Sequence, residues 1–207
     1  MKKFESLLFT LLMTTPFFAW SNTPDDYRAH VIMEAAQMVA SNRPQEHFQF
    51  RGAPIDGHLS DFVAKMKELG YTEKVQYEDG VIMEGTFTGR DAELHILYTP
   101  KSKTVYSVEV YLDKASSWYF LKELYTSYKK EFAKKYEGEG YTREYFEPPY
   151  REGDGKELRA LAEEKCVYAT FFPFIEGEVV LKISRAGQLG IIYSDNQNQE
   201  LYKAEMK

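Results

Sequence analysis

Cysteine is nearly absent from the sequence, which excludes covalent and zinc-based stabilisation. Cys166 is the single cysteine among 207 residues, so the chain can form no internal disulfide and no cysteine zinc box. A lipid anchor attached behind an export signal would also need a cysteine near the N-terminus, and the sequence has none there. Stability must therefore come from packing, for which a chain of this length is long enough.

Catalytic and cofactor-binding motifs are missing as well. The four histidines, at positions 30, 47, 58 and 95, show none of the short spacings typical of zinc sites. The sequence contains no nucleophile elbow, P-loop or dinucleotide fingerprint. Cys166 lies in an apolar stretch typical of a buried strand, where a thiol is usually inert. We therefore assign no catalytic residue, no metal ligand and no cofactor from the sequence.

The N-terminus carries the pattern of an export signal. Lys2 and Lys3 precede an apolar run from Leu7 to Phe18, and Ala19-Trp20-Ser21 offers a small-x-small cleavage site. We expect residues 1–21 to be removed and the mature protein to be periplasmic or secreted. No later stretch approaches the roughly 18 apolar residues of a spanning helix, so the mature chain is not expected to span a membrane.

The charge balance is acidic, with 26 basic and 32 acidic side chains and a net charge of −6. Removal of residues 1–21, which hold two lysines and one glutamate, changes the net charge to −7. The lysines are interleaved with acids and form no basic stripe that could bind phosphates. Nucleic acid is therefore not an expected partner.

Residues 22–49 differ in pattern from the rest of the chain. Tyr27, Val31 and Ala35 recur at helical spacing and predict a helix over about 26–40, followed by a polar linker. We interpret this segment as an N-terminal helical arm. It would either dock loosely or cover an apolar patch of the domain that follows.

Residues 50–207 alternate between helical and strand periodicity and predict one α+β domain. A turn around Pro54 leads into a helix from about Leu59 to Gly70, with His58 or Ser60 as its cap. A second helix begins at Trp118 and carries an aromatic stripe to Tyr136. Alternating patterns predict strands over 81–87, 92–98, 106–112, 166–172, 178–184 and 189–193. Residues 141–164 are expected to form a long surface excursion, and the tail after residue 195 is expected to be frayed.

The order of these elements occurs twice. FVAKMKELGYT at 62–72 aligns with FAKKYEGEGYT at 132–142, and each segment is followed by strands. We therefore expect two helix-plus-three-strand halves, at about 50–115 and 116–207, joined by the Trp118 helix. Their helices should pack on one face of an antiparallel sheet.

The stretch FRGAPIDGHLSDFVAKMKELGY resembles the F-x-G-x-P-I-D-G-x-L-x-x-F opening of uncharacterised exported proteins of the Bacteroides type. This chain departs from the family pattern at His58, where members more often carry a hydroxyl residue. The resemblance implies export but no activity. The doubled layout is also similar to that of β-lactamase inhibitor proteins, in which two such units form one concave sheet that grips a protein partner. That similarity implies a binding function only by analogy of fold.

The leading hypothesis is an exported, non-enzymatic binding or inhibitor-like module with a protein partner or envelope component. It would act through the open sheet face and the 141–155 excursion, since the chain is rich in aromatics, with 16 Tyr, 14 Phe and 2 Trp. The candidate contact residues are Trp118, Tyr145, Phe146 and Tyr150. One alternative is a small periplasmic hydrolase whose acids, such as Glu84 and Glu109, converge only in the folded chain. Another is a structural component of an envelope complex that docks through residues 22–49.

Overall fold

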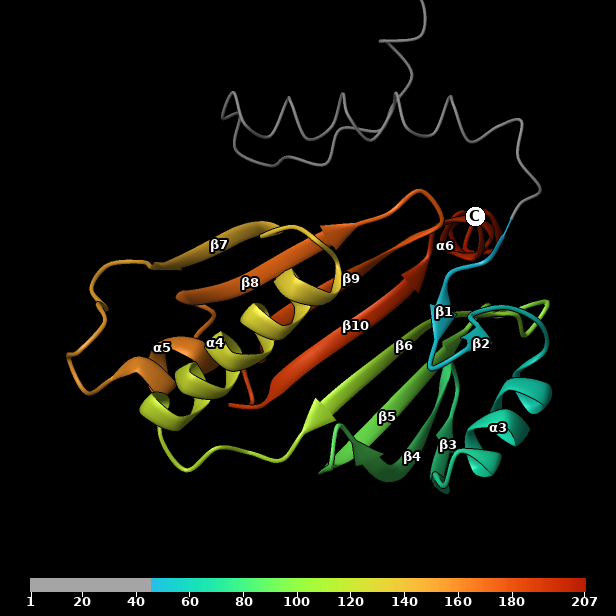
Figure 1. Ribbon diagram of the computed structural model, residues 1–207, viewed down its shortest axis with the longest axis horizontal. Coiled ribbons are helices and arrows are strands. Elements are labelled where there is room, and N and C mark those ends of the chain that lie inside the picture. Colours follow the sequence, from blue (N-terminus) through green and yellow to red (C-terminus); the bar gives the residue numbers. More distant parts are fainter. Residues whose placement is uncertain (1–45) are drawn as a thin grey trace, which may run out of the picture. The chain divides into compact units, whose positions relative to one another are not determined.

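An antiparallel sheet of eight strands organises the domain, in the order β3-β4-β5-β6-β10-β9-β8-β7 (Figure 1). The computed structural model describes residues 46–207. Its sheet strands are β3 (Thr72–Tyr77), β4 (Gly80–Phe87), β5 (Arg90–Tyr98), β6 (Val105–Leu112), β7 (Tyr141–Phe146), β8 (Cys166–Pro173), β9 (Gly177–Ile183) and β10 (Leu189–Asp195). Together with the helices, this large antiparallel sheet confirms the mixed α+β class.

The strand order places two consecutive meanders side by side. Strands β3 to β6 follow one another in the sheet, as do β7 to β10, and the two sets meet where β6 pairs with β10. The prediction of three strands in each stretch is wrong by one, because the outermost strands β3 and β7 were missed. Every residue of β3 is exposed and only half-buried or exposed residues make up β7. Such edge strands lack the buried alternation from which the other strands were predicted.

The two long helices lie where the sequence predicts them. Helix α3 (Leu59–Glu68) begins at His58, whose side chain accepts a hydrogen bond from the Ser60 backbone amide, so His58 and not Ser60 is the cap. Helix α4 (Trp118–Lys135) contacts β9 and β10. Its aromatic stripe faces the core through Tyr125, Tyr128 and Phe132, as its periodicity indicates.

Two further helices correct the expectations for the excursion and the tail. The predicted excursion contains strand β7 and helix α5 (Glu157–Ala162), and α5 contacts β8. The tail after Asp195 forms helix α6 (Asn196–Glu205), which Asp195 caps by accepting a hydrogen bond from the Asn198 amide at 2.9 Å. The polar composition of residues 196–207 predicts a frayed tail. The Asp195 cap and the contacts of α6 with β6, β9 and β10 instead order this segment.

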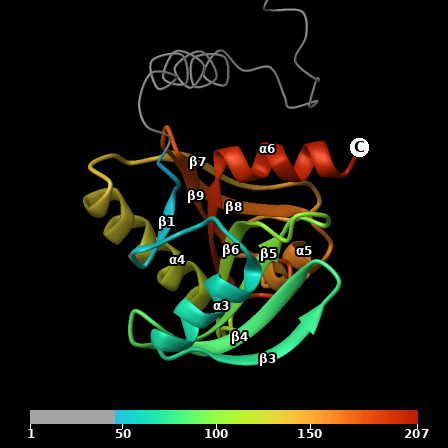
Figure 2. The ribbon, with the colours of Figure 1, turned by 90° about the vertical axis from the view of Figure 1, so that its right-hand side faces the viewer.

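Helix α6 also changes the expected layering. In Figure 1 it is seen end-on beside the ends of β9 and β10, and Figure 2 shows it lengthwise, running to the side away from α4. Tyr202 of α6 stacks on Tyr106 of β6 with ring centroids 4.5 Å apart. The prediction that the helices share one face is therefore wrong for α6, although α3 and α4 do cover the apolar side of the sheet.

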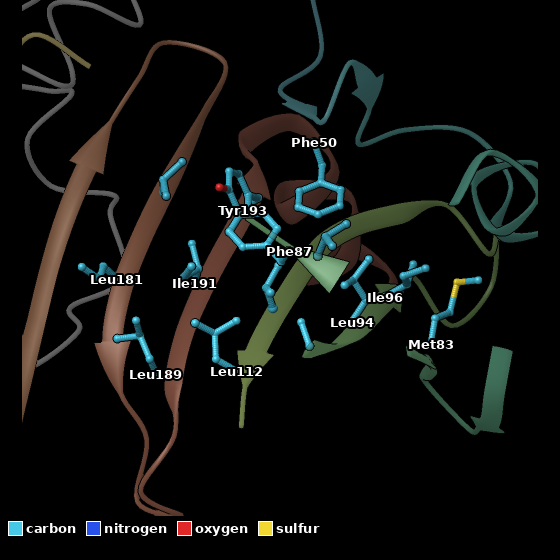
Figure 3. Packing of buried hydrophobic residues seen from close by; sticks show 14 of the residues in the cluster. Phe50, Met83, Phe87, Leu94, Ile96, Leu112, Leu181, Leu189, Ile191 and Tyr193 are labelled. Carbon is cyan, nitrogen blue, oxygen red and sulfur yellow. The ribbon is translucent and has the colours of Figure 1, made fainter. Parts of the chain in front are cut away.

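Phe50 ties the short β1–β2 hairpin to the core of the sheet. Strands β1 (Gln49–Phe50) and β2 (Ala53–Pro54) pair just before α3. The Phe50 side chain is fully buried, stacks on Phe87 at 6.1 Å and meets Tyr193 edge-on at 5.0 Å. Figure 3 shows these three rings together above the apolar residues of the central strands. Phe50 thus joins the end of β4 to the end of β10.

The predicted export signal, residues 1–21, and all but the last residues of the predicted arm lie outside the described residues. Within residues 46–207, none of the helices combines the length and the apolarity needed to cross a bilayer.

Replacing Phe50 with alanine is expected to lower the free energy of unfolding by about 3 to 5 kcal/mol, because it leaves a large cavity where three rings meet. Phe120→Ala is the matched control, since Phe120 is 61% exposed. The control should change stability by less than about 0.5 kcal/mol. Urea unfolding followed by circular dichroism measures both, and equal losses for the two variants would contradict the assignment of Phe50 to the core.

Candidate binding surface on the open face of the sheet

Burial distinguishes the two faces of the sheet, because successive residues of a strand point to opposite sides. On β5, Leu94 and Ile96 are fully buried in the core that α3 and α4 cover. Glu93, His95 and Leu97 alternate with them and are only partly buried. We call the side that carries Glu93 and His95 the open face.

Strand register aligns the open-face residues in rows that cross the sheet. One row is mainly apolar and aromatic and runs through Ile82, His95, Glu109, Ile192, Val180, Phe171 and Tyr141. The row beside it is mainly charged and runs through Glu84, Glu93, Tyr111, Gly190, Lys182, Ala169 and Arg143. Each row contains residues from both meanders, so the open face is a joint product of distant parts of the chain.

A groove of about 560 Å³ lies on this face. It is an open hollow and not an enclosed cavity. Strands β5, β6, β8 and β9, the turn before β10, and helix α5 with the residues that follow it supply its lining. The lining includes Glu93, His95, Tyr111, Leu161, Glu164, Val167, Lys182 and Gln188. Polar and charged groups thus converge over a floor made by the backbone of the sheet.

Glu93 and His95 form a loose pair on one side of the groove. His95 Nε2 lies 3.6 Å from Glu93 Oε2, too far for a hydrogen bond. This buried nitrogen has no hydrogen-bond partner within the part of the chain that the structure describes. The Lys74 ammonium donates to Glu93 Oε1 at 3.1 Å and also pairs with Glu84. The hydrogen bond from Lys74 lowers the pKa of the Glu93 carboxyl below its ordinary value, so Glu93 is ionised and paired at neutral pH.

Tyr111 lies between this pair and the centre of the sheet. Its ring meets the His95 ring edge-on with centroids 5.0 Å apart. Its hydroxyl donates to Glu109 Oε2 at 2.6 Å. Burial, reinforced by this bond, raises the pKa of Tyr111 above its ordinary value, so the phenol stays protonated. Glu109 therefore has a neutral donor, and within residues 46–207 it forms no ion pair.

Lys182 occupies the far side of the groove between two small residues. Its neighbours across the strands are Gly190 on β10 and Ala169 on β8. A Cβ atom at Gly190 would lie 3.0 Å from Tyr111 Cε1 and 3.6 Å from Lys182 Cγ, so glycine leaves room for the Tyr111 ring and the lysine stem. Within residues 46–207 the Lys182 ammonium makes no ion pair or hydrogen bond.

Two of the predicted contact residues belong to an aromatic cluster on the covered side. Trp118 at the start of α4 meets Phe146 of β7 at 5.5 Å and Tyr168 of β8 at 4.9 Å, both edge-on. Its indole nitrogen donates to Glu152 Oε1 at 3.4 Å. Trp118 and Phe146 are partly buried against the core, so they fasten α4 to β7 and β8.

The other two predicted contact residues make no ring contact with this cluster or with each other within residues 46–207. Tyr145 is 45% exposed and points to the opposite side of β7 from Phe146. Tyr150 packs partly against the core and donates its hydroxyl to Glu163 Oε2 at 2.6 Å, which raises the pKa of Tyr150. The structure thus unites Trp118 and Phe146 but not all four, and their role in binding stays a prediction.

A second hollow, of about 630 Å³, lies beside β1 and the end of α4. His47 lines it, with its Nδ1 3.1 Å from Asp195 Oδ2 and its Nε2 3.4 Å from Asp56 Oδ2. Asp195 also caps α6, so this cluster holds the start of the described chain against the end of the sheet. Because the hollow begins at Glu46, the first described residue, we assign no binding role to it.

Two kinds of catalytic arrangement can be checked directly within residues 46–207. No group of three or more His, Cys, Asp or Glu side chains in this range is arranged to hold a metal ion. Glu84 and Glu109, the acids considered for hydrolysis, lie on the open face as their alternation predicts. They are separated by β5 and have different partners, Lys74 and the Tyr111 hydroxyl.

From the sequence, His95 is considered as one of four histidines without metal-site spacing, and Tyr111, Lys182 and Gly190 are not singled out. The side chain of His95 is only 25% exposed. Alternation could have assigned Tyr111 and Lys182 to the open face. Their convergence depends on the register of β6, β10 and β9, for which the sequence carries no direct signal.

The structure is that of an α+β protein whose large antiparallel sheet carries a groove on the face opposite α3 and α4. Comparisons of the chain with protein-family models, with curated proteins and with solved structures find no match.

Cys166 is expected to be unreactive in the folded protein. The thiol is buried, and burial raises its pKa to about 12. At pH 8 only about one thiol in 10,000 would then be ionised. A disulfide reagent such as Ellman's reagent should modify it at least about 100-fold more slowly than free cysteine. Addition of guanidinium chloride should restore the ordinary rate, whereas fast modification of the folded protein would show an accessible thiolate.

Proposed function

We propose that the protein is an exported, non-enzymatic binding module that recognises a protein partner through the open face of its sheet. The uncovered row of apolar and aromatic residues on this face is the observation that carries the proposal. Ile192, Phe171 and Tyr141 are all partly exposed there, although α3 and α4 bury the other side of the same strands. Apolar side chains rimmed by charged ones are typical of protein interaction surfaces.

The form of the surface favours a macromolecular partner over a small ligand. The groove is open, and the rows on either side of it extend across strands from both meanders. Small-molecule sites usually enclose most of their ligand in a concave apolar pocket. A protein loop or edge could instead use the groove and the flanking rows together.

The strand order supports a related proposal about origin. Each meander of four strands follows a helix, α3 before β3 and α4 before β7, and the two meanders meet through the antiparallel β6–β10 pair. We propose that they are two related halves, with α5 inserted in the second. This layout is the basis of the analogy with β-lactamase inhibitor proteins. Membership in the Bacteroides-type exported family and removal of residues 1–21 belong to the same proposal.

A second candidate is a small hydrolase, and the Glu93–His95 pair in the groove is the observation that favours it. A histidine beside a carboxylate is one arrangement used for general base catalysis. Glu93 is already held by Lys74, however, and the groove does not enclose a substrate. These features make binding the better-supported function. A docking role for residues 22–49 in an envelope complex concerns residues that lie mostly outside the described range.

Ile192→Lys is expected to abolish partner binding, because it places a charge in the middle of the apolar row. Phe120→Lys is the matched control, since Phe120 is exposed on α4, on the covered side of the sheet. The mature chain and both variants would be immobilised and exposed to envelope extract and culture fluid of the source cell. A specific partner should be retained by the parent protein and by Phe120→Lys but not by Ile192→Lys.

Unfolding midpoints of the two variants would show that both are folded under the capture conditions. Retention of the same partner by all three proteins would refute recognition through the open face. Loss of the partner from Phe120→Lys alone would move the interface to α4. Hydrolysis of a model ester or glycoside that is lost in His95→Gln would favour the enzymatic candidate instead.

A further inference from the structure

We propose that the groove on the open face recognises a carboxylate of the protein partner, from an Asp or Glu side chain, through the Lys182 ammonium. This inference rests on the proposed function and names the chemistry by which it would act. It follows from the charges of the open face, from the space around Lys182 and from an unpartnered nitrogen at the other side of the groove.

Lys182 is distinguished from the other charged groups of the groove by its lack of a partner within the described residues. Lys74 is shared between Glu84 and Glu93, and Arg185 lies 3.5 Å from Glu164. Glu109 accepts the Tyr111 hydroxyl. Among residues 46–207, the groove therefore offers in Lys182 a cation whose charge is not balanced by a nearby carboxylate. An anionic group of a partner is its natural complement, since electrostatic complementarity selects partners and fixes their register.

The residues beside Lys182 leave space for that group. Gly190 and Ala169, its neighbours across the strands, project at most one carbon from the sheet. The Tyr111 ring and the Lys182 stem both lie beside the space over Gly190 that a Cβ atom would fill. A partner carboxylate can reach the ammonium without displacing a large side chain. The nearby aromatic ring would reduce the competition from water that weakens exposed ion pairs.

His95 supplies a second polar contact at the opposite side of the same groove. Its buried Nε2 atom has no partner within the described residues, and a buried polar group without a partner is unfavourable until a ligand or water satisfies it. His95 on β5 and Lys182 on β9 are three strand spacings apart and lie in neighbouring rows, which separates them by roughly 16 Å. A peptide of about five extended residues spans that distance. The occupant is therefore a short acidic segment that bonds to His95 at one end and to Lys182 at the other.

The test uses the mature chain labelled with ¹⁵N and two synthetic peptides, acetyl-Gly-Glu-Ala-Gly-amide and its Gln analogue. Backbone and His95 ring resonances would be followed by NMR during titration up to about 10 mM peptide, a range that detects weak binding. The Glu peptide should shift Lys182, Gly190 and His95 and approach saturation. The Gln peptide should bind about tenfold more weakly, because it lacks the charge-assisted bond.

Lys182→Met should abolish the difference between the peptides, and Lys182→Arg should keep it. Lys134→Met removes a lysine from the exposed face of α4 and serves as the control that retains parental behaviour. Equal binding of the two peptides, shifts confined to other surfaces, or no shifts that depend on Lys182 would each overturn the carboxylate assignment. If Ile192→Lys still loses the captured partner in that case, the open face remains the interface and only its chemistry has been misassigned.

Discussion

The pairing of β6 with β10 is the interaction on which the rest of the structure depends. It is an antiparallel pair in register from Ser107–Ser194 to Tyr111–Gly190, and it joins two meanders that lie far apart in the sequence. Without it the chain would hold two four-stranded sheets, each with one more exposed edge. With it, a single large sheet forms: α3 and α4 cover one face, and the other face carries the groove and, beside the ends of β9 and β10, helix α6. The groove exists only because Tyr111 and Lys182 are brought to either side of Gly190 by this pairing.

The lead-in hairpin reinforces the same junction. Phe50 packs on Phe87 of the first meander and on Tyr193 of the second, so the motif that stands out in the sequence contributes a side chain to the place where the meanders meet. Asp195 and Asn198 add polar contacts at this end, because Asn198 donates to the carbonyl groups of Ile55 and Val105. The F-x-G-x-P-I-D-G stretch is thereby explained as a structural element. Its distinctiveness reflects the demands of a tight hairpin, a helix cap and a buried aromatic ring.

The two faces of the sheet differ in composition: one supplies the core, and the other is the proposed recognition surface. The covered face is almost wholly apolar and carries the aromatic cluster of Trp118, Phe146 and Tyr168, which fastens α4. The open face mixes partly exposed aromatics with charges, most of which are already paired with one another. Pairing of this kind limits the cost of holding charges on a half-buried surface. Within the groove, the Lys182 ammonium has no such partner among residues 46–207. The aromatic richness of the chain therefore has a structural origin on one face and a proposed functional one on the other.

Periodicity in the sequence was sufficient to determine the class of the fold and its best-covered elements. The helix of Leu59 and Phe62, the Trp118 helix and the six inner strands each bury one face, so their apolar residues recur at 3.6 or 2 residues. The edge strands and α6 escaped prediction because they bury little and are ordered by caps, backbone pairing and contacts with distant segments. The candidate site depends even more on such contacts. That Glu93, His95 and Lys182 belong to the open face follows from alternation within each strand. Strand order and register bring these residues to one groove. Both depend on packing between residues that are separated by up to about half of the chain, which a local sequence pattern does not specify.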